Sequence, residues 1–286
     1  MTGSANVLRG IAVAGAAAVL LAGCGSPSER AADNGDPDDD VVTLRVGATP
    51  LPHAEVLEFV DDELAAEAGL AIEVVEYTDY NQPNAALAEG ELDANYYQTV
   101  PFLEEYLEGN PGADLAYVAD VHLEAFGLYS QDAEDLDGLS EGAEIAVPND
   151  SSNMDRALRL LEEQDLITLA DGTEGQASES DIEDNPLDVT ITPVEAAQLP
   201  RSLQDVDAAV VNGNYALEAD LPETANALAW EETEDNPYAN GLVVRSEDVE
   251  SEDVLRFNEL LHSQEVRDFM EERWQGIVIP VGGTEE

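Results

Sequence analysis

Residues 145–161 of the chain, IAVPNDSSNMDRALRLL, place an apolar run, a polar turn and a helical pattern in direct succession. The first three residues indicate a buried strand. Ser152 and Asp155 have the spacing of a helix capping box, and apolar residues follow at helical intervals, at positions 157, 158, 160 and 161. The stretch therefore predicts a strand, a tight turn and a helix that includes 156–164.

Arg156 falls in the first turn of this predicted helix. The helix dipole is positive there, so a cation is locally unfavourable unless an anion binds beside it. Free backbone N–H groups and a planar guanidinium together form a clamp for a carboxylate. The alternative is a surface arginine that pairs with one of the many acidic side chains, and the local pattern leaves both interpretations open.

The same alternation of strands and helices extends outward along the chain. Strands are expected at 41–46, 71–77, 92–96, 115–121, 126–130, 144–147, 189–193, 208–211 and 242–245, with helices between most of them. Residues 168–184 are expected to form a loop with short helix. The alternation predicts an α/β fold with mainly parallel sheets, and the chain is long for one sheet.

The composition is strongly acidic. The 286 residues carry 64 acidic side chains against 10 arginines and no lysine, for a formal charge of −54. Such a surface repels nucleic acids, so no nucleic-acid partner is expected. The acidic excess leads to the hypothesis that the protein works in high salt, where counter-ions screen self-repulsion. Unfolding or expansion on dialysis to low salt is the result that this hypothesis predicts.

The first 41 residues indicate export and a lipid anchor. Residues 1–23 have a basic start and a short apolar stretch, the pattern of a signal peptide. They end in the residues LAG, directly before Cys24, and the sequence LAGC matches the lipobox of bacterial lipoproteins. Cys24 is the only cysteine in the sequence. A buried structural cysteine is the alternative, but the Gly/Ser/Pro-rich flank does not favour it. Residues 24–41 are expected to be the lipidated cysteine and an acidic tether.

No pattern in the chain indicates catalysis. The sequence lacks a Gly-x-Ser-x-Gly motif, and a phosphate-binding loop that needs lysine is impossible. His53, His122 and His262 are far apart and lack metal-ligand spacing, so they are interpreted as ordinary histidines. We expect no enzyme activity, catalytic residue, metal site or cofactor.

Aromatic and amide side chains gather at the predicted strand ends and turns, where ligands bind in open α/β sheets. Tyr80 and Tyr97 are the aromatic examples, and Asn153, Asn212 and Asn240 are the amides. Taken singly, each asparagine is explained by turn chemistry and each tyrosine by packing. Together with the carboxylate clamp they form the set of groups that a free apolar amino acid requires.

Six stretches carry a resemblance to a known family. They are TLRVGATPLPHAEVLE (43–58), TDYNQPNAALAEGELDANYYQTVPFLEEY (78–106), GLYS (127–130), AVPNDSSNMDRALRLLE (146–162), EAAQLPRSLQDVDAAVVNGNYALEA (195–219) and NPYANGLVVR (236–245). The chain resembles the methionine-binding lipoproteins of the NlpA type, substrate receptors of bacterial ABC importers. The resemblance implies a two-lobed, periplasmic-binding-protein-like fold of type II, with two crossover strands and the ligand in the cleft. Lobe 1 would take 42–124 and 240–286, and lobe 2 would take 125–239.

The resemblance also implies roles for the candidate residues. Arg156 would bind the ligand carboxylate, with Asn153 one turn earlier on the same helix. Asn212 and Asn240 would hold the amino and carboxylate groups. No acidic residue is assigned to the ammonium, for which Asn240 and backbone carbonyls are expected.

At the side-chain end of the pocket, the resemblance implies that Tyr80 and Tyr97 line the wall. Thr99 stands where family members often have histidine. This departure bears on selectivity between methionine and its relatives.

The implied partners are methionine, a membrane permease and the ATPase that drives it, with the receptor as a monomer held to the membrane through lipid on Cys24. ATP is not expected to bind this chain. Three alternatives stay open: a receptor for another small amino acid, a receptor for a methionine-containing dipeptide, and a surface interaction protein without a transport role.

Overall fold

The computed structural model describes residues 41–173 and 175–282. The predicted signal peptide, Cys24 and all of the tether except residue 41 lie outside the described residues. Among the described helices, none is both long and apolar enough to cross a membrane.

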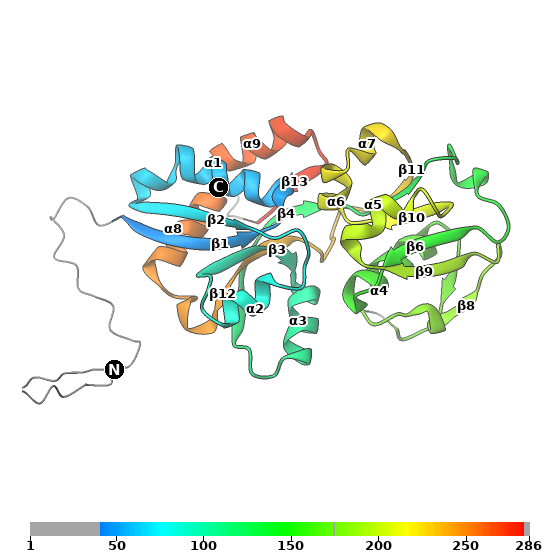
Figure 1. Ribbon diagram of the computed structural model, residues 1–286, viewed down its shortest axis with the longest axis horizontal. Helices are drawn as coiled ribbons and strands as arrows, with labels where there is room; N and C mark the ends of the chain where they lie inside the picture. The colour runs from blue at the N-terminus through cyan, green and yellow to red at the C-terminus, as the bar shows by residue number, and fades with distance from the viewer. Residues whose placement is uncertain (1–40, 174, 283–286) are drawn as a thin grey trace, which may run out of the picture. The chain divides into compact units, whose positions relative to one another are not determined.

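Lobe 1, as the term is used below, is a six-stranded sheet with the helices packed on it (Figure 1). The strand order is β13-β4-β12-β3-β1-β2. The strands are β1 (Val42–Ala48), β2 (Leu70–Glu76), β3 (Ala94–Thr99), β4 (Leu115–Glu124), β12 (Asn240–Arg245) and β13 (Val278–Pro280). The helices are α1 (Glu55–Glu63), α2 (Pro83–Ala88), α3 (Val100–Gly109), α8 (Glu252–Leu261) and α9 (Gln264–Trp274).

Lobe 2 is a five-stranded sheet of order β11-β5-β10-β6-β9 with its own helices. The strands are β5 (Gly127–Ser130), β6 (Glu144–Pro148), β9 (Thr190–Val194), β10 (Ala208–Val211) and β11 (Asn226–Trp230). The helices are α4 (Ser151–Glu163), α5 (Leu199–Ser202), α6 (Gly213–Glu218) and α7 (Leu221–Thr224). A small hairpin, β7 (Thr168–Leu169) with β8 (Ile182–Asp184), accompanies them.

Short helical turns complete the described secondary structure. One π-helical turn spans Pro50–Ala54, before α1. The 3-10 turns are Ala65–Ala68, Leu136–Gly138, Glu179–Asp181, Ala196–Gln198 and Ser246–Asp248. Helix α1 ends at Glu63 and is followed by the 3-10 turn at Ala65–Ala68, because Leu64 leaves the α conformation (φ −125°).

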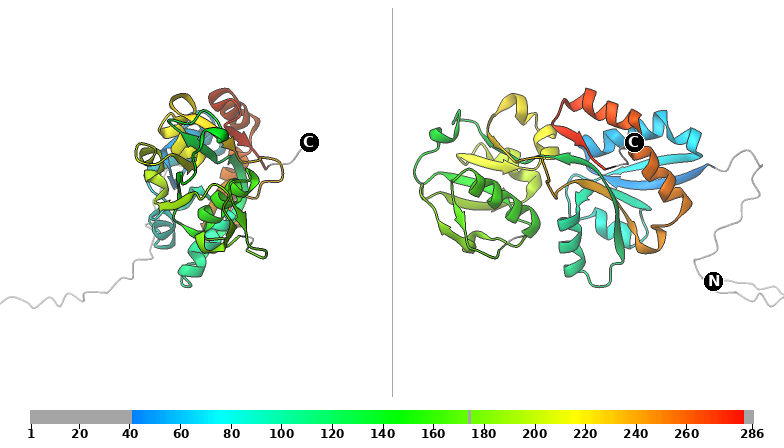
Figure 2. Two further views of the ribbon diagram at one scale, coloured as in Figure 1. Left: turned by 90° about the vertical axis from the view of Figure 1, so that its right-hand side faces the viewer. Right: turned by 180° about the vertical axis from the view of Figure 1, so that it is seen from behind.

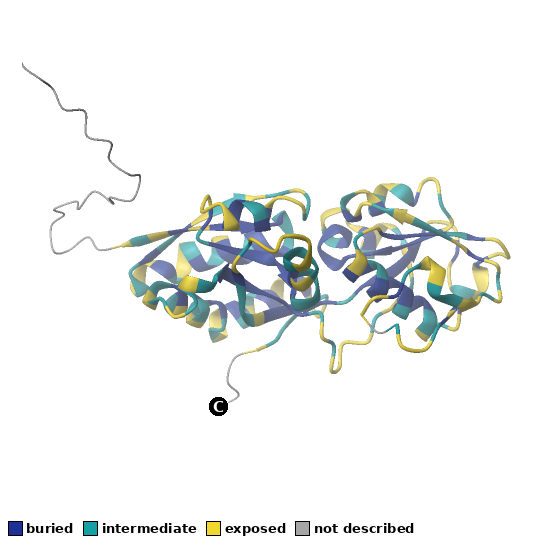
Figure 3. Cartoon of the chain, turned by 90° about the horizontal axis from the view of Figure 1, so that it is seen from below, coloured by how far each residue is buried: buried dark blue, intermediate teal, exposed yellow. Residues whose placement is uncertain are grey.

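Each lobe buries its own apolar core. In lobe 1, Phe257 and Leu57 are fully buried against the sheet, and the rings of Phe59 and Phe269 stack at 4.4 Å where α1 and α9 lie side by side (Figures 1 and 2). In lobe 2, Leu158 of α4 packs in a separate cluster with strand β6. The central strands are buried in both lobes, while the helices expose their outer faces (Figure 3). The chain, which is long for one sheet, therefore forms two sheets with separate cores.

The prediction of mainly parallel sheets is wrong. Five of the nine strand pairings in the two described main sheets are antiparallel and four are parallel. The antiparallel pairings all involve β4, β5, β11, β12 or β13, and the chain passes from one lobe to the other between β4 and β5 and again between β11 and β12. Hydrophobic periodicity identifies strands but not their direction, so the pattern could not distinguish the two cases.

The strands β11 and β13 and one small hairpin were not expected from the sequence. β11 is an edge strand with mostly exposed residues, and β13 has three residues, so neither shows a clear apolar period. The hairpin of β7 and β8 lies in the segment expected to be loop and short helix. None of these three belongs to the alternating strand–helix pattern that predicted the α/β fold.

Candidate functional site

The start of α4 is organised by Asp150, which is the N-cap of the helix. Its Oδ1 accepts hydrogen bonds from the backbone N–H of Asn153 (3.0 Å) and from Asn153 Nδ2 (2.7 Å). The predicted capping box of Ser152 and Asp155 is therefore wrong. Ser152 is already helical and donates its hydroxyl to Asp150, while Asp155 accepts the backbone N–H of Ala177 at 2.7 Å. Aspartate ranks with serine among the preferred N-cap residues, and here Asp150, directly before the helix, takes that role.

Arg156 is buried at 3% exposure, and its guanidinium is fixed from several sides. Nε and Nη2 donate to the two carboxylate oxygens of Glu231 at 2.8 and 2.6 Å, and Nη2 also donates to the Glu124 carbonyl at 2.9 Å. The guanidinium carbon lies 3.8 Å from the ring centre of Phe126 and 4.5 Å from that of Tyr238. Arg156 is thus paired with an acid, yet it is a buried and preorganised group. Among the described residues, Nη1 makes no hydrogen bond.

A small cavity lies against this arginine. Side chains of both lobes line it. The lining residues are Tyr80, Tyr97, Gln98, Thr99, Phe102, Glu124, Phe126, Asn153, Arg156, Asn212, Gly213, Asn214 and Asn240. The structure therefore brings together all seven side chains that the sequence analysis placed in a ligand site, although they come from five separate stretches of the chain.

Amide groups form one wall of the cavity. Asn212 Nδ2 donates to Asn153 Oδ1 at 3.2 Å, and both side chains are buried. Asn212 Oδ1 and Asn214 Nδ2 are buried atoms without a hydrogen-bond partner among the described residues. A buried polar atom that stays unpaired costs about 1–3 kcal/mol. This wall thus offers a free acceptor and a free donor to whatever occupies the cavity.

Aromatic rings form another wall, next to the amides. The ring centres of Tyr80 and Tyr97 are 5.9 Å apart, and Tyr80 lies 5.6 Å from Phe102. Tyr80 donates its hydroxyl to Asn214 Oδ1 at 2.6 Å, a contact between lobe 1 and lobe 2. Burial raises the pKa of Tyr80 and of Tyr97 well above the usual value, so both hydroxyls are neutral. This wall therefore offers apolar, polarisable surface without charge.

Thr99 has a local structural role at this wall. It is the N-cap of α3, and its Oγ1 accepts the backbone N–H of Phe102 at 3.4 Å. Phe102, in the first turn of α3, lines the cavity with it. The sequence analysis missed Phe102, because it treated the segment after Thr99 only as a helix.

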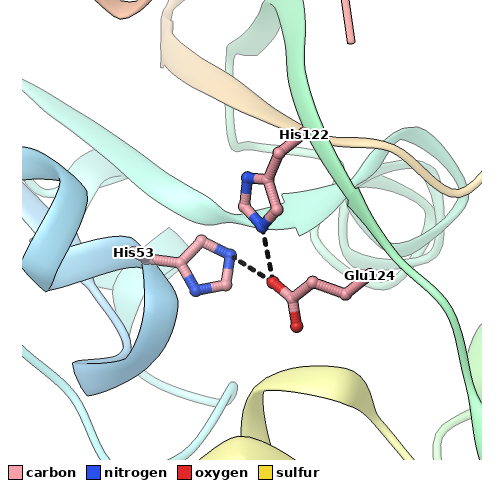
Figure 4. A group of neighbouring side chains, drawn as sticks. All are labelled: His53, His122 and Glu124. Atoms are coloured by element: carbon pink, nitrogen blue, oxygen red, sulfur yellow. Dashed lines mark hydrogen bonds and ion pairs between the residues drawn. The ribbon is translucent and has the colours of Figure 1, made fainter. Parts of the chain in front are cut away.

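Glu124 is the one carboxylate among the lining residues, and the sequence analysis missed it as well. Its Oε1 lies 2.6 Å from His122 Nε2 and 3.4 Å from His53 Nε2 (Figure 4). All three side chains are at most 4% exposed. His53 and His122, which were interpreted from the sequence as ordinary histidines, therefore form one buried group with Glu124. Strand β4 presents His122 and Glu124 two residues apart on one face, and the turn before α1 brings His53 to them.

The three side chains have the donor atoms of a metal site, since one ligand atom from each lies within 4.8 Å of the others. Hydrogen bonds already account for both rings. His53 Nδ1 lies 2.7 Å from Thr49 Oγ1, His53 Nε2 lies 3.2 Å from Asn240 Oδ1, and His122 Nδ1 contacts the hydroxyl of Tyr96. The cluster is therefore complete as a hydrogen-bonded network without an ion.

Burial controls the charge of this cluster. It lowers the pKa of His53 to about 4 and that of His122 to about 3, so both rings are neutral near pH 7. Burial also raises the pKa of Glu124. The His53 ring, Arg156 and the backbone N–H of Asn214 act in the opposite direction and favour the carboxylate.

His262 is separate from the site. Its ring nitrogens contact the backbone carbonyls of Asn258 and Asp120, both at 2.7 Å. For this histidine the sequence interpretation agrees with the structure.

Residues 44–282 match the model of the NlpA lipoprotein family. The chain is 35% identical over 265 residues to the methionine-binding lipoprotein MetQ of Bacillus subtilis. This alignment covers 92% of this chain and 94% of that protein.

Solved structures agree with the family match. A nutrient-binding protein from Burkholderia cenocepacia, solved bound to methionine, is 39% identical with a TM-score of 0.78 and covers 84% of this chain and 100% of its own. A periplasmic substrate-binding protein of an ABC transporter from Coxiella burnetii is 37% identical with a TM-score of 0.79 and covers 83% and 100%.

Proposed function

Because the chain belongs to the NlpA lipoprotein family, we propose that it is a receptor that binds methionine in the cavity and delivers it to an ABC permease. The predicted two-lobed solute-binding fold is confirmed by the solved relatives. We propose that lobe 1 comprises 42–124 and 240–286 and that lobe 2 comprises 125–239. The chain acts by binding and not by catalysis.

The observation that carries the proposal is that one small cavity presents a guanidinium and a carboxylate together. Arg156 turns Nη1 to a ligand carboxylate, and Glu124 receives the ammonium group. The unpaired Asn212 Oδ1 and Asn214 Nδ2 complete the contacts with these two groups. The ring of His53 links Asn240 to Glu124. Asn153 accepts a hydrogen bond from Asn212 and so orients that side chain. Such a set of opposite charges and amides fits a zwitterion.

The aromatic wall supports methionine as the side chain of that zwitterion. Burial of an apolar side chain of this size contributes about 1.5–3 kcal/mol. A thioether against Tyr80, Tyr97 or Phe102 adds about 0.3–1.5 kcal/mol. Thr99 shapes this end by starting α3, which places Phe102 at the cavity.

The site of action follows from the N-terminus. After residues 1–23 are removed, the lipid on Cys24 holds the protein to the outer face of the cytoplasmic membrane. The acidic tether connects Cys24 to lobe 1. Closure of the two lobes on methionine is the signal to the permease, and a cytoplasmic ATPase drives the transport step. The receptor works as a monomer and needs no cofactor.

Mass spectrometry of the small molecule that the purified protein releases on denaturation tests the ligand. Methionine is the expected product. Release of a methionine-containing dipeptide or of another amino acid would identify one of the rival receptors. A protein that releases nothing and binds no amino acid after refolding would be a surface interaction protein instead.

A further inference from the structure

Glu124 lies in a buried network of hydrogen bonds with His53 and His122 that apolar packing alone does not require. Among the cavity-lining side chains, this is the one acidic group, and it is only 4% exposed. Isolated buried carboxylates take up a proton, because the charged form loses its hydration. A receptor that uses Glu124 for an ammonium group therefore needs partners that keep it ionised.

The hydrogen bonds determine which ring nitrogen carries the proton in each histidine. His53 Nε2 faces two acceptors, Asn240 Oδ1 and Glu124 Oε1, so it must be the N–H, and Nδ1 accepts from Thr49. His122 Nε2 faces Glu124 Oε1 at 2.6 Å, so it is also the N–H. Its Nδ1 then accepts from the hydroxyl of Tyr96. Both rings are neutral and both direct an N–H to the same carboxylate oxygen.

The second oxygen of Glu124 is not bonded to either histidine ring. It points away from both rings, toward helix α6 (Figure 4). Gly213 begins that helix, and a Cβ atom there would lie 2.8 Å from Oε2 and 2.5 Å from the Glu124 Cβ. The absence of a side chain at this position therefore leaves room for the carboxylate at the cavity.

We propose that His53 and His122 are positioning residues that hold Glu124 as a carboxylate whose second oxygen accepts the ligand ammonium. The inference rests on the proposed function, because it assigns the amino-group end of the same cavity. It implies that the receptor selects ligands with a free amino group, and that this selectivity depends on two residues that do not line the cavity.

The pH dependence follows from the groups that face Glu124. These are His53 from the turn before α1, His122 from β4, Arg156 from α4, and Asn214 and Glu218 from α6. The ammonium binds only the ionised carboxylate, so affinity falls as the pH decreases through the pKa of Glu124. Loss of an N–H donor raises that pKa further and moves the fall in affinity to higher pH. The histidines stay neutral above about pH 4 and do not titrate in this range.

Calorimetric titration of three proteins tests the inference: the wild type, His122→Leu and His122→Gln. The glutamine amide can replace the lost N–H donor, whereas leucine cannot. Each protein is titrated from pH 5 to pH 8 with methionine and with 4-(methylthio)butanoic acid, which lacks only the amino group. Thermal melts establish that each variant is folded.

We expect His122→Leu to weaken methionine binding roughly 10-fold to 100-fold near pH 6, with little change for the analogue. Its pH midpoint should rise by about one unit, and His122→Gln should restore most of both effects. An equal loss for both ligands at every pH, with no rescue by glutamine, would overturn the inference.

Two further outcomes are distinguishable. If His122→Leu does not fold, Glu124→Gln tests the same point, because it removes the charge at nearly constant shape. It should reduce the preference for methionine over the analogue, and an unchanged preference contradicts the inference. Failure of the wild type to bind methionine at all would instead refute the proposed function.

Discussion

Replacement of Glu105 by glutamine is expected to weaken ligand binding, although this side chain does not line the cavity. Glu105 belongs to α3 in lobe 1, and its two oxygens accept the backbone N–H groups of Ser151 (3.0 Å) and Ser152 (2.8 Å) at the start of α4 in lobe 2. The carboxylate therefore joins the lobes at the positive end of a helix dipole. Such a contact forms only when the lobes are closed.

The magnitude follows from the kind of contact that is lost. A carboxylate at a helix N-terminus contributes about 0.3–1 kcal/mol, and up to about 2 kcal/mol in partly buried geometry. Glutamine keeps one oxygen acceptor but loses the charge and the second acceptor. A loss of about 1 kcal/mol in the closed state alone corresponds to roughly fivefold weaker binding.

Calorimetry and stopped-flow dissociation measure this effect. The expected result for Glu105→Gln is a faster dissociation rate with a nearly constant association rate, because the contact follows the encounter. Glu104→Gln is the matched control, since Glu104 is an exposed neighbour on the same helix. The difference between the two variants should shrink at high salt. Identical affinities and dissociation rates would refute the idea that Glu105 stabilises the closed form.

Three other substitutions test the remaining parts of the structure. Glu231→Gln breaks a buried ion pair and should lower the free energy of unfolding by about 3–5 kcal/mol in urea titrations, with weaker methionine binding in calorimetry; unchanged values would contradict the pairing. Gly213→Ala should weaken methionine binding by displacing Glu124, whereas Gly109→Ala, with open space around it, should bind normally; equal affinities would contradict the steric argument. Leu158→Ala in the core of lobe 2 should cost about 2–5 kcal/mol of stability in urea, and a cost below 1 kcal/mol would show that this core is loosely packed.

The parts of the fold that the sequence predicts are those with local signals. The strand expected over 144–147 and the helix with Leu158 and Leu161 on its apolar face are both present, because an apolar run and helical spacing are properties of neighbouring residues. Strand direction is different, since it depends on where the chain crosses between the lobes. Strand β11 lies at a sheet edge and has mostly exposed residues, so its sequence shows no apolar alternation.

The candidate site divides in a similar way. Arg156 had a local signal, a cation at the start of a helix, whereas its partner Glu231 comes from a distant crossover segment. The network of His53, His122 and Glu124 depends on packing between remote elements. A partial signal did exist, because His122 and Glu124 are ionisable residues two apart at the buried end of strand β4. Such a pair on one buried face requires a partner.

The central claim is that the cavity binds one methionine through its zwitterionic end. Its most direct test is calorimetric titration of methionine into refolded, ligand-free protein, with Arg156→Ala beside it. Arg159→Ala is the matched control, because Arg159 lies on the same helix and pairs with Asp155 and Glu162. We predict one methionine per chain for the wild type and the control, and binding roughly 10-fold to 100-fold weaker for Arg156→Ala. A wild type that gives no saturable heat, or an Arg156→Ala variant with unchanged affinity, would contradict the claim.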